Sequence, residues 1–313
     1  MRNRDINEYF YTPETTVARR VWGVFTALSE PPLRPAESLQ SAPGALDLPL
    51  SAIFSPRMDD LYLILATLTF LGGFILAAIS WRRESDLPHG LNIPLAIAGL
   101  VFQTLFLGER GDLHGRCPIT NGAEILVFVS WSIVIMYLAL GRAFRLSLLG
   151  VFSMPIVFLF QVIAIISLAI GDPGARPPAR LDPWLELHAA MSLLAYGAFG
   201  LAAIAGVMYF VQDRQLKSHH PGRLFYSMPP IRYLADALVR LLVIGTVLLS
   251  IGIVAAFFME VKPNAAHLLI SGAVWLAYVF LLAAHTLKRL PPKRLALSAL
   301  VAFAFALATL SAL

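Results

Sequence analysis

Residues 241–258 have the sequence LLVIGTVLLSIGIVAAFF, an uninterrupted run without a single charged side chain. A helix of about 20 apolar residues spans the hydrocarbon core of a bilayer. Such a helix also pairs its own backbone N–H and C=O groups, which hydrocarbon cannot solvate. This run therefore predicts a membrane-spanning helix, and the preceding residues, which include Asp236 and Arg240, extend it over 233–258.

Comparable apolar runs recur along most of the chain. Runs of about 18 residues or more give about eight predicted spans, over residues 61–80, 92–107, 123–143, 147–171, 187–211, 233–258, 267–286 and 295–313. The second span is the weakest because it is short and contains Pro94 and Gln103, so a tilted or partly re-entrant segment is the alternative there. The sequence predicts an all-α, polytopic integral membrane protein.

The composition excludes a soluble globular enzyme. Of the 313 residues, 58% are hydrophobic and 14% are charged, whereas about 25% are charged in an ordinary soluble domain. The net charge of +5 arises from cations in short loops between apolar runs, so it does not indicate nucleic-acid binding. The chain has one cysteine, Cys117, which excludes an internal disulfide framework and a four-cysteine zinc site. A redox or metal role would therefore depend on histidine.

The charge of the loops predicts the orientation, because Lys and Arg tend to stay on the cytoplasmic side of a membrane. Alternate loops carry clusters of cations, such as Arg82 with Arg83 and Lys293 with Arg294. The other loops hold fewer cations and always some acidic residues, as around Arg110. We expect the first set in the cytoplasm and both ends of the helical core outside, in a bacterial inner (plasma) membrane.

Residues 1–57 differ from the rest of the chain. Arginines alternate with acidic residues there, a Pro-rich run follows at 30–35, and no apolar core is long enough for a signal peptide. We expect either a disordered polar extension or a mis-assigned start, with Met58 as the physiological first residue. The transmembrane domain then comprises 58–313.

Seven histidines divide between the two sides of the predicted bundle. His114, His188 and His267 are expected on the outer side, in the loop after the second span and at the outer ends of the fifth and seventh spans. Imidazole binds iron well, and two histidines at opposed helix ends can be the axial ligands of heme. Each of these histidines alone is better explained as a hydrogen-bonded interfacial side chain, but three on one side favour a heme site.

The sequence around His188 is the most informative. His188 closes the segment WLELH at 184–188 and begins an apolar helical stripe through Met191 and Ala195, because residues three and four apart share a helix face. A flat hydrophobic macrocycle could lie against such a stripe.

Basic residues flank His114 in the segment ERGDLHGRCP at 109–118. Guanidinium groups bind carboxylates in a bidentate manner, so Arg110 and Arg116 could hold heme propionates; an ordinary solvated loop is the alternative. Glu124 begins the third span, where a buried acid needs a partner. We expect that partner to be Arg110 or Arg116.

Three glycines of the fifth span, Gly197, Gly200 and Gly206, superficially resemble a nucleotide-binding fingerprint. No predicted strand precedes them, as that fingerprint requires. Close packing between helices is therefore the expected role.

Three segments together resemble the cytochrome c assembly family, of the CcsA and CcmC type. The first is GRCPITNGAEIL at 115–126, followed by Trp131. The second is 184–196, with a histidine at a helix entry and Tyr196 two turns later. The third, MPPI at 228–231, is similar to the HemX-like branch. Their order along the chain strengthens the resemblance, which covers roughly the whole hydrophobic region.

The resemblance implies a protein that binds heme on the outer face and presents it to apocytochrome c. Carried over, His188 would be an axial ligand of the heme iron. We expect His267, which matches no residue of the family pattern, or His114 as the second ligand, and Arg110 or Arg116 near the propionates. The implied partners are heme, apocytochrome c and other assembly subunits within the lipid bilayer.

Two departures from the family pattern favour an alternative. The segment FMEVKPN at 258–264 lacks the tryptophans of transport-competent members, and the late outer histidine of full-length synthases is missing. The alternative is a HemX-like membrane regulator or partner of heme-biosynthesis or assembly complexes that does not transfer heme. An assembly or heme-delivery factor is favoured over a stand-alone lyase. A small-anion transporter is a third class, supported only by Pro94 and Pro155 as helix breaks.

Overall fold

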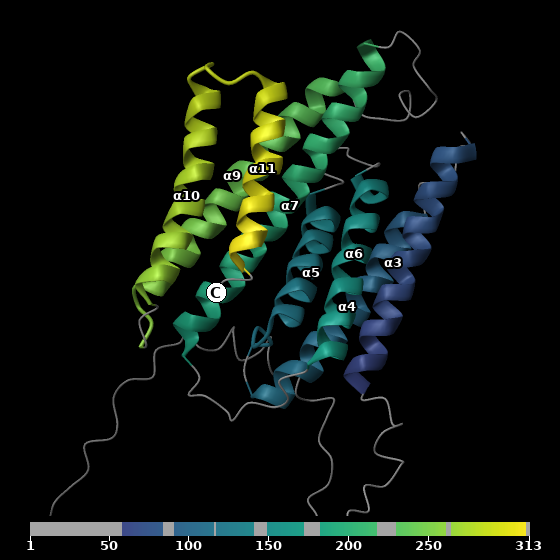
Figure 1. The fold of residues 1–313 in the computed structure, drawn as a ribbon, viewed down its shortest axis with the longest axis vertical. Helices are drawn as coiled ribbons and strands as arrows, with labels where there is room; N and C mark the ends of the chain where they lie inside the picture. The colour runs from purple at the N-terminus through teal and green to yellow at the C-terminus, as the bar shows by residue number, and fades with distance from the viewer. Residues whose placement is uncertain are drawn as a thin grey trace, which may run out of the picture. The chain divides into compact units, whose positions relative to one another are not determined.

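The computed structural model describes residues 58–83, 91–115, 117–140, 149–171, 182–217, 230–260 and 264–310. These residues form eight long helices (Figure 1): α3 (Met58–Arg83), α4 (Asn92–His114), α5 (Gly122–Leu140), α6 (Leu149–Ile170), α7 (Pro183–Lys217), α9 (Ile231–Ala256), α10 (Ala265–Thr286) and α11 (Pro292–Leu310). Each is long and apolar enough to cross a membrane, and no strand occurs within the described ranges. The protein is an all-α, multi-pass membrane protein, as the sequence predicts. The N-terminal extension 1–57 lies outside the described residues.

Each predicted span corresponds to one helix, but α4 and α7 run further than their hydropathy indicates, α7 over Pro183–Lys217. Helix α4 is one continuous helix of 23 residues that reaches His114, so the second span is longer than predicted and long enough to cross a membrane. Arg110 and His114, which we expected in a loop, lie in the last turns of this helix. The helix ends at Gly115, whose left-handed backbone (φ 61°) is the usual helix-terminating conformation of glycine.

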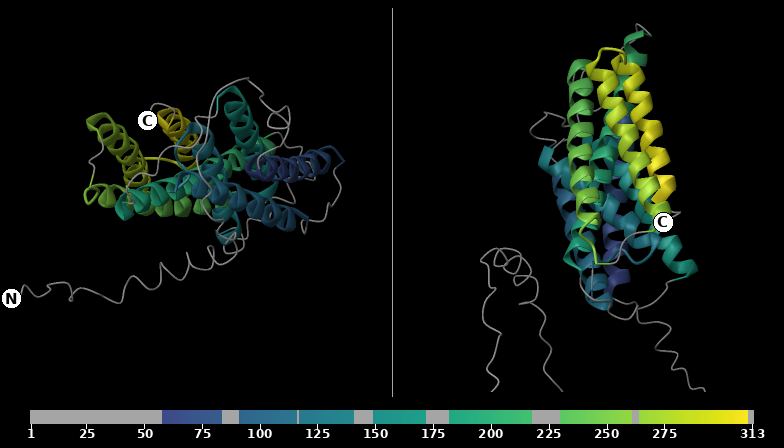
Figure 2. Two further views of the ribbon diagram at one scale, coloured as in Figure 1. Left: turned by 90° about the horizontal axis from the view of Figure 1, so that it is seen from below. Right: turned by 90° about the vertical axis from the view of Figure 1, so that its left-hand side faces the viewer.

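Helix α7 is the central helix of the described bundle. It packs most extensively against α9 and also contacts α5, α6 and α11. Helices α3 to α6 pack among themselves, and α10 packs against α9 and α11. Figure 2 shows the two groups on either side of α7.

Small residues allow α7 to approach its neighbours closely. A Cβ atom at Gly197 would lie 2.5 Å from the Cβ of Ser132 in α5, and one at Gly206 would lie 3.2 Å from the carbonyl oxygen of Ala296 in α11. Glycine brings helix backbones together in membranes because dispersion contacts replace the hydrophobic effect there. The expectation that these glycines serve helix packing is confirmed.

The helices alternate in direction, so the elements of the predicted site meet at one end of the bundle. The C-terminal end of α4 and the N-terminal ends of α5, α7 and α10 all lie there (Figure 1); we call it the pocket end. At the opposite end, Lys217 of α7 and Lys293 of α11 both pair with Asp213, at 2.8 and 3.4 Å.

Candidate functional site

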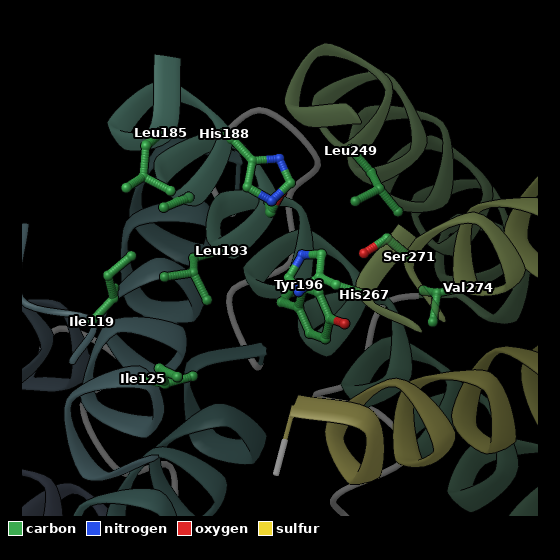
Figure 3. Close-up of a pocket in the computed structure, with 12 residues that line it drawn as sticks. Ile119, Ile125, Leu185, His188, Leu193, Tyr196, Leu249, His267, Ser271 and Val274 are labelled. Atoms are coloured by element: carbon green, nitrogen blue, oxygen red, sulfur yellow. The ribbon is translucent and has the colours of Figure 1, made fainter. Parts of the chain in front are cut away.

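A pocket of about 230 Å³ lies at the pocket end and is lined chiefly by α7 and α10 (Figure 3). Ile119 just before α5, Ile125 at the start of α5 and Leu249 of α9 complete the lining. Most of its lining is apolar, and its polar side chains are His188, Ser192, Tyr196, His267 and Ser271. An apolar pocket with a few convergent polar groups is typical of sites for cofactors and small molecules.

The first turn of α7 is fixed by Asp182, which directly precedes the helix. Its Oδ1 accepts a hydrogen bond from the backbone N–H of Trp184 (3.0 Å), as a helix N-cap does. Its Oδ2 accepts another from the backbone N–H of Glu260 (2.9 Å), just after α9. One carboxylate thus joins the start of α7 to the end of α9, and His188 follows within two turns.

His188 is held by the neighbouring helix. Its Nδ1 lies 2.8 Å from the carbonyl oxygen of Gly252 in α9. A carbonyl oxygen only accepts hydrogen bonds, so Nδ1 carries the proton and donates it. In the neutral imidazole this leaves the lone pair of Nε2 available. The arrangement is that of metal-binding histidines, whose second nitrogen is usually bonded to a carbonyl or carboxylate.

His267 faces His188 from α10. Asn264 caps α10, and its Oδ1 accepts a hydrogen bond from the backbone N–H of His267 (2.7 Å). The two imidazole rings lie 5.7 Å apart between centroids, with 55° between their planes. Two imidazoles that share one metal through bonds of about 2 Å would have ring centres roughly 6 Å apart. The observed separation of the ring centres is close to that value.

Arg110 and His114 belong to a separate, buried cluster at the same end. The Nε2 of His114 lies 3.0 Å from Oε1 of Glu124, and the Nε of Arg110 lies 3.5 Å from the same oxygen. Arg110 also pairs with Asp59 of α3, at 3.4 Å. The expectation that Arg110 partners Glu124 is confirmed.

The structure brings two of the five predicted site residues together in the pocket, His188 and His267. The described lining contains neither Arg110 nor His114, and Arg116 lies outside the described residues. A role of Arg110, His114 and Arg116 in holding heme stays a prediction.

The buried cluster still borders the pocket. Glu124 accepts hydrogen bonds from both the backbone N–H (2.7 Å) and the hydroxyl (2.8 Å) of Thr120. These bonds fix the segment between α4 and α5, and the adjacent Ile119 and Ile125 form one wall of the pocket. The cluster therefore shapes the pocket without facing it.

Two contributors to the site were not predicted from the sequence. Ser271 lies four residues after His267 on α10, so helical spacing would have indicated it. The role of Gly252 had no signal in the sequence, because it depends on how α9 is placed against α7.

Comparisons with known proteins agree with the resemblance. The family model "Cytochrome C assembly protein" matches residues 119–311. The chain is 25% identical over 168 residues to cytochrome c biogenesis protein CcsA of Porphyra purpurea, covering 50% of this chain and 53% of that protein. It is 30% identical over 122 residues to CcsA of Nostoc punctiforme, covering 38% and 34%. It is 29% identical over 179 residues to Protein HemX of Brevibacillus brevis, covering 55% and 62%.

In each of these comparisons the chain spans less than two thirds of the relative's own length. The family model covers a larger share of this chain than any of these three relatives does. It includes every residue named in the lining of the pocket, and it covers more than half of the sequence. The chain therefore belongs to the cytochrome c assembly protein family.

Proposed function

We propose that this protein binds heme in the pocket lined chiefly by α7 and α10 and so supports cytochrome c maturation at the outer face of a bacterial inner membrane. The observation that carries the proposal is the facing pair of His188 and His267, 5.7 Å apart between ring centroids. The bond from His188 to Gly252 supports it by leaving Nε2 available as a ligand. The relatives named as cytochrome c biogenesis proteins support the biological role.

Heme, when bound, would supply an iron that binds imidazole nitrogen. His188 and His267 would hold that iron, and the apolar lining would exclude water from the macrocycle. Among the other predicted residues, Arg116 is a candidate partner of the propionates. Arg110 and His114 are weaker candidates because both already bond to Glu124 in the buried cluster.

Hemin titration of the purified protein tests the proposal. We expect one hemin per chain and the spectrum of a bis-imidazole heme, and we expect His188→Ala to lose that spectrum. His285→Ala is the matched control, because His285 lies in the last turn of the same helix as His267 and its Nδ1 bonds to Leu290 at the opposite end (3.2 Å). An unchanged spectrum in His188→Ala would remove that residue from the site.

We further propose that the pocket end faces outward. The support is the clustering of Arg214, Lys217, Lys288 and Lys293 at the opposite end, since cationic ends tend to stay in the cytoplasm. Alkaline phosphatase fused after residue 264 should then be active, and the same enzyme fused after residue 290 should be inactive. The reverse pattern of activity contradicts this orientation.

A second candidate function is that of a HemX-like membrane partner or regulator without heme transfer. The match to Protein HemX favours it, because that match covers 62% of the relative, against 53% and 34% for the two CcsA proteins. The absence of tryptophan from residues 258–264 also favours it. A protein that binds hemin but passes none to an apocytochrome c peptide would support this second function.

A further inference from the structure

We infer that Gly252 is a positioning residue for His188: the lack of a side chain at this position lets α9 approach α7 closely enough for the Gly252 carbonyl to hold the imidazole. The inference rests on the proposed function in so far as that imidazole binds heme. The placement of His188 by Gly252 can be tested without heme.

A methyl group at Gly252 would fit only if its neighbours moved by a few tenths of an ångström. A Cβ atom there would lie 2.7 Å from Oγ of Ser192, 3.3 Å from the carbonyl oxygen of His188 and 3.3 Å from the backbone nitrogen of Ser192. The hydroxyl of Ser192 can rotate away, but the two backbone atoms move only if α7 moves. A methyl group at position 252 would therefore push the two helices apart at the site of the hydrogen bond.

That hydrogen bond tolerates little displacement. Its length of 2.8 Å lies within the usual N–H···O range of about 2.7–3.2 Å, so a displacement of more than a few tenths of an ångström takes it out of that range. Without this bond, no other hydrogen bond among the described residues fixes which nitrogen of His188 carries the proton. Loss of a group that orients a metal-binding histidine typically lowers metal affinity by roughly 10- to 100-fold. We expect a loss of that size in Gly252→Ala.

Two other glycines provide matched controls. A Cβ atom at Gly272, on the helix that carries His267, would meet nothing within 4 Å, so Gly272→Ala tests the addition of a methyl group alone. A Cβ atom at Gly245, also on α9, would lie 2.4 Å from the ring of Phe199 in α7. Gly245→Ala therefore disturbs the packing of α7 against α9 two helical turns away from the His188 bond.

The experiment compares hemin affinity and the absorption spectrum of the full chain and these variants. We expect weaker binding and a partly high-spin spectrum in Gly252→Ala, wild-type behaviour in Gly272→Ala, and a wild-type spectrum in Gly245→Ala even if its Tm falls. Adding Ser192→Ala to Gly252→Ala removes the 2.7 Å contact and should restore part of the affinity. Wild-type affinity in Gly252→Ala, or an equal loss in Gly245→Ala, would overturn the inference.

A readout without heme separates this inference from the proposed function. If the wild-type protein takes up no hemin, the proposed function fails. The ¹⁵N NMR shifts of labelled histidine then still report the tautomer of His188, assigned by the signal lost in His188→Ala. We expect the Nδ1–H tautomer in the wild-type protein and a mixture in Gly252→Ala. The same tautomer population in both proteins would overturn the positioning role.

Discussion

The imidazoles of His188 and His267 lie 5.7 Å apart between ring centroids, although they belong to different helices. Each ring is placed by the start of its own helix: Asp182 caps α7 and Asn264 caps α10. Because both helices begin at the pocket end (Figure 1), the pair depends on two capped helix starts within a packed bundle. Side chains that stand on packed helices are held in position more precisely than side chains that stand on loops.

Removing the carboxylate of Glu124 should destabilise the protein strongly. This residue is fully buried and bonds to Arg110, His114 and Thr120. Removing one member of a buried charge pair typically costs about 3–5 kcal/mol, because the remaining charge stays buried. We expect Glu124→Ala to lower the Tm in detergent well below that of Glu109→Ala, which removes an exposed acid of α4. Equal Tm values for the two variants would show that the cluster adds little stability.

Adding a methyl group at Gly197 should also destabilise the bundle. The new Cβ would lie 2.5 Å from the Cβ of Ser132 and 2.6 Å from its carbonyl carbon, so α5 and α7 would have to separate. Overpacking of this kind costs about 1–3 kcal/mol. We expect a lower Tm for Gly197→Ala than for Gly272→Ala, and Ser132→Gly should not rescue it because the backbone contact remains. A Tm equal to that of Gly272→Ala would refute the close contact.

Cys117 should react slowly with alkylating reagents at neutral pH. It lies between α4 and α5, and burial, followed by the negative charges of Glu186 and Glu124, raises the pKa of its thiol from 9.0 to about 11. Burial and nearby negative charge both disfavour the thiolate, which is the reactive form. Two pH units lower the thiolate fraction at neutral pH by roughly 100-fold.

The measurement is the rate of iodoacetamide modification against pH, with the SDS-denatured protein as control. We expect the rate for the folded protein to reach half its maximum near pH 11, whereas the rate for the denatured protein should do so near pH 9, the ordinary pKa of this thiol. Glu186→Gln should shift the folded profile to lower pH. A folded profile with its midpoint near pH 9 is incompatible with the burial of Cys117.

The fold could be predicted from the sequence because hydropathy alone marks a membrane-spanning helix. The error at Arg110 and His114 has a physical cause. Charged residues usually end a span, but here Asp59 and Glu124 from two other helices pair with Arg110 and allow α4 to continue. Pairing between helices is a tertiary property, so a single sequence does not reveal it.

Part of the candidate site could also be predicted from the sequence. His188 and His267 were identified because both begin apolar helices on the expected outer side. The contribution of Gly252 depends on the contact between α7 and α9, and no spacing within either segment indicates that contact. The sequence thus identifies candidate ligands, and the structure identifies the group that orients one of them.

The most direct test of the account is the electron paramagnetic resonance spectrum of the hemin-loaded protein, because it reports how many strong axial ligands the ferric iron has. The account predicts a low-spin signal for the wild-type protein and a high-spin signal for His267→Ala, with His188 as the remaining ligand. A low-spin signal that persists unchanged in His267→Ala would contradict the claim that His188 and His267 share one iron.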